Sequence, residues 1–240
     1  MDALLLLLLD SRSPAGAHNH SAGMEAAVAT GLVSDLAGVE AFCRARLRTA
    51  GRVAAEFAAA ACALAASSAL RGGAAGRHAV GAPAGSPRTA AVRTDWTELD
   101  AELDARTPSE AQRAASRQLG RGLRRMVRAM IPDFDPPASH HALVLGAAVA
   151  AAGGTPELAA RAAALGSVAT PASAAVRLLG LDPFAVQGLL ADLARAVDRG
   201  DFAGLTTARS PRSELAADAD PALDLLADYH LTTEVRLFAS

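Results

Sequence analysis

Apolar positions recur at helical spacing along most of the chain, and they predict a protein built from α-helices. The residues that share such a face are Leu119, Leu123, Met126, Val127 and Met130 in one segment, and Val186, Leu189, Leu190, Leu193 and Val197 in another. Sustained alternation of apolar and polar residues, which is typical of strands, is confined to the last few residues.

Helix starts are indicated by a capping residue followed by proline, because proline at the first helical position loses no intrahelical hydrogen bond. This pairing occurs at Thr107-Pro108, Thr155-Pro156, Thr170-Pro171, Asp182-Pro183 and Asp220-Pro221, and Glu110 adds a capping box to the first. The pattern predicts helices that start near 108, 140, 156, 171, 183 and 221. The first half of the chain is predicted to form helices at about 3–10, 23–30, 35–50, 53–70 and 95–105.

These elements predict an all-α fold, a single domain of about ten helices over residues 1–240. The segment 71–94 is rich in Gly, Ala, Pro and Arg and is predicted to be a flexible surface loop. The helices before it are too few to bury their own faces, so this loop does not separate two domains.

The composition supports helices and excludes some chemistry. The chain of 240 residues is 51% hydrophobic but only 3% aromatic, so its core must consist of Ala, Leu and Val. All 23 basic residues are arginine. Without lysine the chain has neither a Walker-A phosphate contact nor a Schiff-base nucleophile. The formal net charge of −2 argues against a bulk nucleic-acid binder.

Compartment signals favour the cytoplasm. Cys43 and Cys62 lie in apolar helical surroundings and are predicted to be buried, inert thiols. The six leucines of Leu4–Leu9 lack the preceding positive charge of a signal peptide. The apolar segment Val53–Leu70 contains Glu56 and much alanine, and therefore reads as a buried core helix with no role in a membrane.

Histidines and carboxylates could form a metal site. His20, His140, His141, Asp133 and Asp135 would be its ligands, but their spacing is not that of a known metal motif. No Gly-x-Ser-x-Gly elbow occurs either. We therefore expect no catalytic, cofactor-binding or metal-binding residues. A helical metalloenzyme that uses these five residues stays as the rival hypothesis.

A basic stripe marks the segment 113–128. It consists of Arg113, Arg117, Arg121, Arg124, Arg125 and Arg128. Nucleic acid or an acidic protein could bind it. The preceding segment carries Asp95, Glu98, Asp100, Glu102 and Asp104, which favours pairing within the chain or a solvated face.

Both ends of the chain are apolar, which is unusual for free termini. The chain opens with Leu4–Leu9 and closes with Glu234-Val235-Arg236-Leu237-Phe238-Ala239-Ser240. These ends either dock on the chain's own core or become ordered against another protein.

Four motifs carry a family resemblance. They are Asp10-Ser11-Arg12-Ser13-Pro14-Ala15-Gly16-Ala17-His18-Asn19-His20-Ser21-Ala22-Gly23-Met24-Glu25, Arg113-Ala114-Ala115-Ser116 with Gly120, Ala172-Ser173-Ala174-Ala175-Val176-Arg177-Leu178, and Arg236-Leu237-Phe238-Ala239-Ser240. In order and over nearly the whole chain, they resemble the UreF family of urease accessory proteins. His18 stands where that family has an aromatic residue, and Met24 where it has leucine.

The resemblance implies a non-enzymatic, all-α, dimeric protein that binds no cofactor itself. With the compartment signals and the net charge, we expect a cytoplasmic protein that binds neither nucleic acid nor a membrane. It implies that the chain binds UreD, recruits the GTPase UreG and apo-urease, and assists GTP-dependent nickel insertion. By the same resemblance, the ends at 1–25 and 231–240 bind the partners. The site residues carried over are Pro14, Gly16, His20, Ser21, Gly23, Glu25, Val235, Arg236, Leu237 and Phe238.

Overall fold

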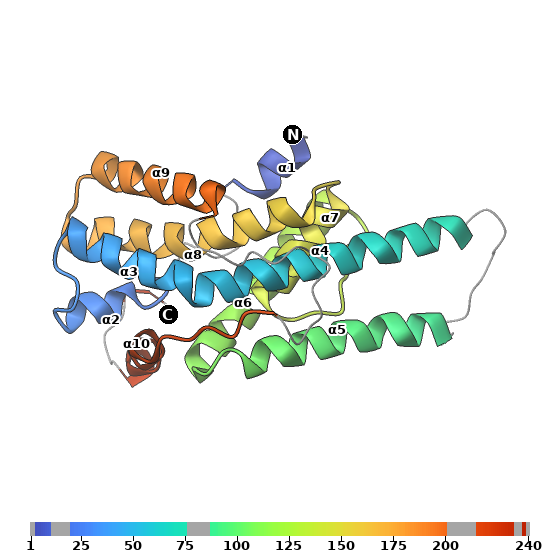
Figure 1. Ribbon diagram of the computed structural model, residues 1–240, viewed down its shortest axis with the longest axis horizontal. Helices are drawn as coiled ribbons and strands as arrows, with labels where there is room; N and C mark the ends of the chain where they lie inside the picture. Colours follow the sequence, from blue (N-terminus) through green and yellow to red (C-terminus); the bar gives the residue numbers. More distant parts are fainter. Residues whose placement is uncertain (1–2, 11–19, 76–86, 201–214, 233–236, 239–240) are drawn as a thin grey trace.

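The computed structural model describes residues 3–10, 20–75, 87–200, 215–232 and 237–238 (Figure 1). Within them every regular element is a helix, which confirms the predicted all-α fold. The helices are α1 (Ala3–Leu8), α2 (Met24–Ala29), α3 (Leu36–Arg48), α4 (Ala50–Ala75), α5 (Pro87–Ala105), α6 (Glu110–Met130), α7 (His141–Ala151), α8 (Pro156–Leu179), α9 (Pro183–Arg199) and α10 (Pro221–Thr232).

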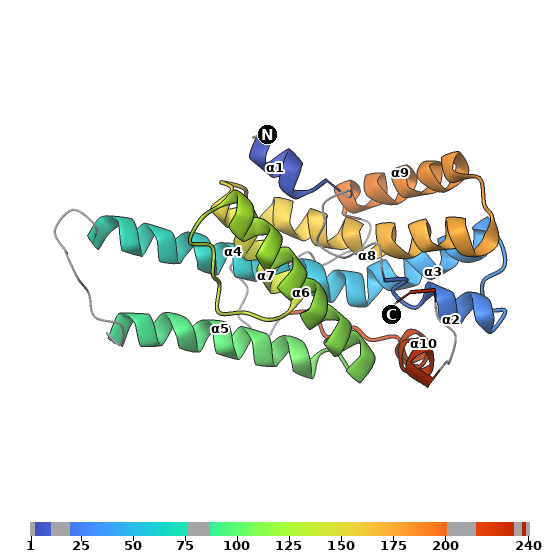
Figure 2. The same ribbon diagram turned by 180° about the vertical axis from the view of Figure 1, so that it is seen from behind.

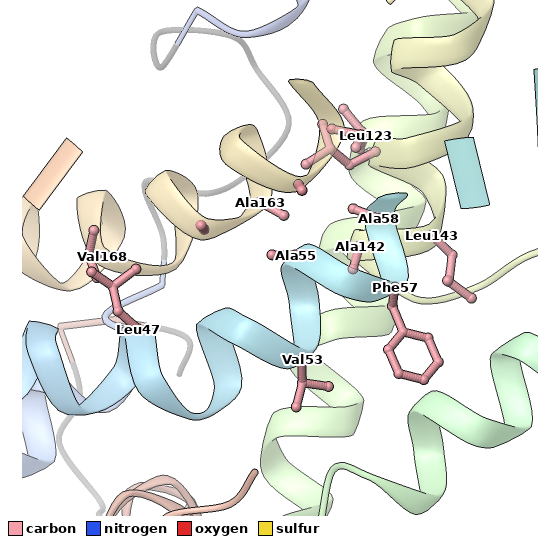
Figure 3. Packing of buried hydrophobic residues seen from close by; sticks show 14 of the residues in the cluster. Leu47, Val53, Ala55, Phe57, Ala58, Leu123, Ala142, Leu143, Ala163 and Val168 are labelled. Atoms are coloured by element: carbon pink, nitrogen blue, oxygen red, sulfur yellow. The ribbon is translucent and has the colours of Figure 1, made fainter. Parts of the chain in front are cut away.

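Helix α4 lies at the centre and packs against α7 and α8. Small side chains let these helices approach closely, and Figure 3 shows Ala55, Ala58, Ala142 and Ala163 among the larger Phe57, Leu123 and Leu143. Helices α4 and α7 approach closely at Gly146 of α7, where a Cβ atom would lie 2.1 Å from the Ala58 carbonyl oxygen. Alanine and glycine thus set the spacing of the core.

The remaining helices surround this centre. Helix α9 packs on α8, and α5 lies beside α4 (Figure 1). Helix α6 packs against α7, and α10 contacts both α6 and α2 (Figure 2). Helix α2 also packs against α8. Residues 20–23, which lead into α2, therefore lie near α3, α8 and α10.

Three of the predicted cap–proline starts are confirmed. The Thr155 hydroxyl accepts the Leu158 N–H at 3.3 Å, and the Asp182 carboxylate accepts the Phe184 N–H at 3.0 Å, at the first turns of α8 and α9. The Asp220 carboxylate accepts the Ala222 N–H at 3.0 Å before α10. The predicted apolar faces of α6 and α9 also point inward, since Leu123, Val127, Val186 and Leu193 are buried.

The predicted helix start near 108 is confirmed to within two residues, but the predicted cap at Thr107 is wrong. Helix α6 begins at Glu110, and its cap is the buried Ser109, whose hydroxyl oxygen accepts the Gln112 N–H at 3.2 Å. A contact from α10 explains the shift, because Asp228 accepts the Ser109 hydroxyl at 2.6 Å and the Ala111 N–H at 3.3 Å. This carboxylate stabilises the positive end of the α6 dipole.

The predicted start at Pro171 is also wrong, because Pro171 lies inside α8. Proline has no N–H, so the carbonyl of Ser167, four residues earlier, lacks its helical donor. Arg46 of α3 supplies a substitute, and its Nε donates to the Ser167 oxygen at 3.1 Å. A tertiary contact thus lets one helix continue through a proline that would otherwise end it.

The predicted loop at 71–94 is wrong at both of its ends, and its middle, 76–86, lies outside the described residues. Residues 71–75 continue α4, and residues 87–94 form the first half of α5. Alanine and arginine favour helix strongly enough to extend α4 through Gly72 and Gly73, and Pro87 occupies the first turn of α5.

Two helical segments, Ala50–Ser68 and Pro156–Leu179, are long and apolar enough to cross a membrane by length and composition alone. Half of the first lies buried in the molecule. Glu56 is 1% exposed within it and accepts the Ala216 N–H at 2.6 Å. This agrees with the prediction of a core helix at Val53–Leu70.

Candidate functional site

The opening segment enters α2 through a left-handed backbone. His20 and Ser21 are buried, Ala22 has a φ of 53°, and Gly23 caps the helix with a φ of 90°. Glycine adopts this conformation without the steric cost that a Cβ atom would add. The turn directs the chain onto α2, which places Glu25 in its first turn. Pro14 and Gly16 lie outside the described residues.

The described part of the C-terminal tail, Leu237 and Phe238, docks on α2. The two Glu25 carboxylate oxygens accept the N–H of Leu237 at 2.7 Å and of Phe238 at 3.2 Å. Phe238 is buried, and its ring centre lies 4.4 Å from the guanidinium carbon of Arg177 on α8, a cation–π distance. We call Glu25, Arg177, Leu237 and Phe238 the tail site. Val235 and Arg236 fall outside the described residues.

Each end of the chain is only partly covered by its own core. Phe238 is buried, whereas Leu237 is 77% exposed. In α1, Leu5 and Leu8 are buried, whereas Leu6 and Leu7 are exposed. The first alternative from the sequence therefore holds in part, because buried residues at each end pack on the molecule. The second alternative, ordering against another protein, stays a prediction.

A cavity of about 300 Å³ lies next to residues 20–23. Its lining includes His20 and Gly23 from that segment, Arg46 from α3, His141 from α7 and Asp224 from α10. Burial lowers the pKa of His20. Burial, together with the nearby His20, lowers the pKa of His141 to about 4. Both imidazoles are therefore neutral at pH 7.

The low pKa of His141 predicts a loss of stability in acid. In the unfolded chain the pKa of histidine is about 6.5, so between that pH and about 4 only the unfolded chain binds the proton. The free energy of unfolding should fall by roughly 3 kcal/mol as the pH drops through this window. Urea denaturation at several pH values measures it. His141→Gln should flatten the dependence, and an equal slope in both proteins would contradict this assignment.

The five residues of the rival metal hypothesis do not gather. Among the residues whose structure is described, no group of three or more His, Cys, Asp or Glu side chains could hold a metal ion. His140 is buried, with its Nε2 2.9 Å from Asp104 and its Nδ1 3.0 Å from the Ser116 hydroxyl. Asp135 pairs with Arg128 at 2.5 Å. These contacts join loops and helices, so the geometry gives the metalloenzyme hypothesis no support.

Both cysteines are buried, as predicted, and are not disulfide-bonded. Burial raises the pKa of Cys43 to about 12 and of Cys62 to about 11. Protonated thiols are poor nucleophiles and poor metal ligands, which fits inert core residues.

Much of the basic stripe is paired within the chain. Arg113 donates to the carbonyls of Thr107 at 2.6 Å and Pro108 at 2.7 Å. Arg117 pairs with Asp104. Farther along α6, Arg124 and Arg128 both pair with Asp135, whereas Arg121 and Arg125 are exposed. Four of these six arginines therefore contact the segments that flank α6 in the chain.

Two arginines near the tail site, Arg177 and Arg46, were not identified from the sequence. Arg177 lies within a quoted motif, but only its contact with Phe238 reveals its role. Arg46 donates to the Ala22 carbonyl at 3.0 Å as well as to Ser167. No local sequence pattern predicts these contacts, because each joins segments that are far apart in the chain.

Comparison with known proteins places the chain in a family. Residues 33–194 match the family model described as UreF. The chain is 39% identical to the urease accessory protein UreF of Mycolicibacterium vanbaalenii, with 99% of this chain and 98% of the relative covered. It is 40% identical to the UreF of Mycobacterium marinum over the same shares. The chain therefore belongs to the UreF family of urease accessory proteins.

Proposed function

We propose that the chain is a non-enzymatic scaffold of urease maturation. It binds UreD, recruits the GTPase UreG and apo-urease to the resulting complex, and assists GTP-dependent nickel insertion. It acts as a cytoplasmic homodimer, and nickel and GTP are handled by the partner complex. Family membership supports the general role, since the relatives are named urease accessory proteins.

The observation that carries the proposal is the joining of the two chain ends at the tail site. Glu25 fixes the backbone of Leu237 and Phe238, and Phe238 anchors the tail against Arg177. The exposed Leu237 side chain is thereby held in a defined position at the surface. A fixed, protruding apolar side chain suits a groove on a partner protein, because little conformational entropy remains to be lost on binding.

Co-purification tests this proposal. Tagged wild-type protein should capture UreD and UreG from the same source. A chain truncated after Thr233 should lose UreD, and Arg236→Ala should lose UreG. Leu237→Ala should weaken UreD capture about tenfold, as expected for an interface anchor. Leu32→Ala is the matched control, because Leu32 is also an exposed leucine, at 62%, and is not part of the tail site.

The results distinguish an error in the assigned contact from an error in the proposed function. Retention of UreD by the truncated chain would show that the tail is not the contact. Failure of the wild-type chain to capture either partner would contradict the proposed function itself.

A further inference from the structure

Arg46 ties together two segments that also hold the tail. From α3, its Nη1 donates to the Ala22 carbonyl at 3.0 Å and its Nε donates to the Ser167 carbonyl at 3.1 Å. Ala22 lies three residues before Glu25, and Ser167 lies on α8 together with Arg177. One guanidinium therefore links the entrance of α2 to the middle of α8.

Both carbonyls are at places where the backbone needs outside support. Ser167 has lost its helical donor to Pro171. Ala22 has a left-handed φ of 53°, a conformation that a residue with a side chain keeps only where its surroundings hold it. The planar guanidinium can donate in two directions at once, which the single ammonium of a lysine does less well.

The tail site spans the same two elements. The tail backbone is bound by Glu25 on α2, and the Phe238 ring is bound by Arg177 on α8. Both contacts form together only if α2 and α8 keep their relative positions. Helix α2 has only six residues, so it depends on such outside contacts for its placement.

We propose that Arg46 is a positioning residue for the tail site. By holding Ala22 and Ser167 at a fixed separation, it places Glu25 and Arg177 so that both contact the tail at the same time. Its importance for UreD capture rests on the proposed function, whereas its effect on the tail does not. Arg46 is not among the site residues that the family resemblance implies.

Amide hydrogen exchange of the isolated full-length chain tests this inference. In Arg46→Met, the Leu237 and Phe238 amides should exchange at least tenfold faster than in the wild type, while Val144 and Val149 in the core keep their protection. Arg46→Lys should restore part of the tail protection. Arg44→Met is the matched control, since Arg44 lies on the same helix and pairs only at the surface with Glu40.

A double variant separates positioning from folding. Pro171→Ala returns an N–H to α8 and so gives the Ser167 carbonyl a helical donor without Arg46. In Pro171→Ala with Arg46→Met, the core should be as protected as in Pro171→Ala alone, while the two tail amides still exchange faster. Wild-type tail protection in this double variant, or equal loss at core and tail amides, would overturn the inference. Because no partner is present, these results do not depend on UreD binding.

Discussion

Replacing Gly146 with alanine should lower the free energy of unfolding by about 3 kcal/mol, because an added methyl group overpacks the core. The new Cβ would lie 2.1 Å from the Ala58 carbonyl oxygen and 2.9 Å from the Ala61 Cβ. Neither neighbour can rotate away, since one is backbone and the other is a methyl carbon on α4. Helices α4 and α7 would have to separate, and the packing of α8 against both would loosen with them.

Gly188→Ala is the matched control for this change. Gly188 lies in α9, and no atom is within 4 Å of the position its Cβ would take. The same substitution should therefore stabilise the protein by up to about 1 kcal/mol, because alanine favours helix more than glycine does. Urea denaturation of both variants measures the difference. A Gly146→Ala protein as stable as the wild type would contradict the close contact of α4 with α7.

Replacing Glu56 with alanine should cost about 3 kcal/mol of unfolding free energy, because it removes one partner from a buried charged network. The Glu56 carboxylate is almost fully buried and accepts the Ala216 N–H at 2.6 Å and the Arg52 Nε–H at 3.2 Å. Arg52 also pairs with Asp218 at 3.2 Å. The variant leaves the Ala216 amide buried without this acceptor and frees the segment that leads into α10.

Glu40→Ala is the control for the second change. Glu40 also pairs with an arginine four residues away, Arg44, but that pair is exposed to solvent. Its loss should cost no more than about 0.5 kcal/mol. Thermal or urea denaturation compares the two variants. Equal, small losses would mean that Glu56 is not a structural anchor of the segment around Ala216.

Much of the fold follows from local signals in the sequence. The apolar faces of α6 and α9 and the caps at Thr155, Asp182 and Asp220 act within one or two helical turns, so their residues suffice to predict them. The errors at Thr107 and Pro171 have a different origin. Asp228 moves the start of α6, and Arg46 supports α8 through a proline. Both contacts join residues more than a hundred positions apart, which no local pattern contains.

The candidate site was predictable in a different way. Glu25, Leu237 and Phe238 were identified through the resemblance of the two chain ends to UreF proteins, and the structure brings these residues together. Neither periodicity nor spacing could have paired a carboxylate near one end with amides near the other. Arg177 and Arg46 complete the arrangement only in three dimensions, since each acts through a tertiary contact.

Calorimetric titration with purified UreD tests the proposal that the docked tail forms the UreD-binding surface. The wild-type chain should bind, and Glu25→Ala should bind at least tenfold more weakly, because it releases the backbone of Leu237 and Phe238. Glu40→Ala, which changes a surface carboxylate on α3, should bind as the wild type does. Equal affinity of the Glu25→Ala and wild-type chains for UreD would contradict a UreD-binding surface at the docked tail.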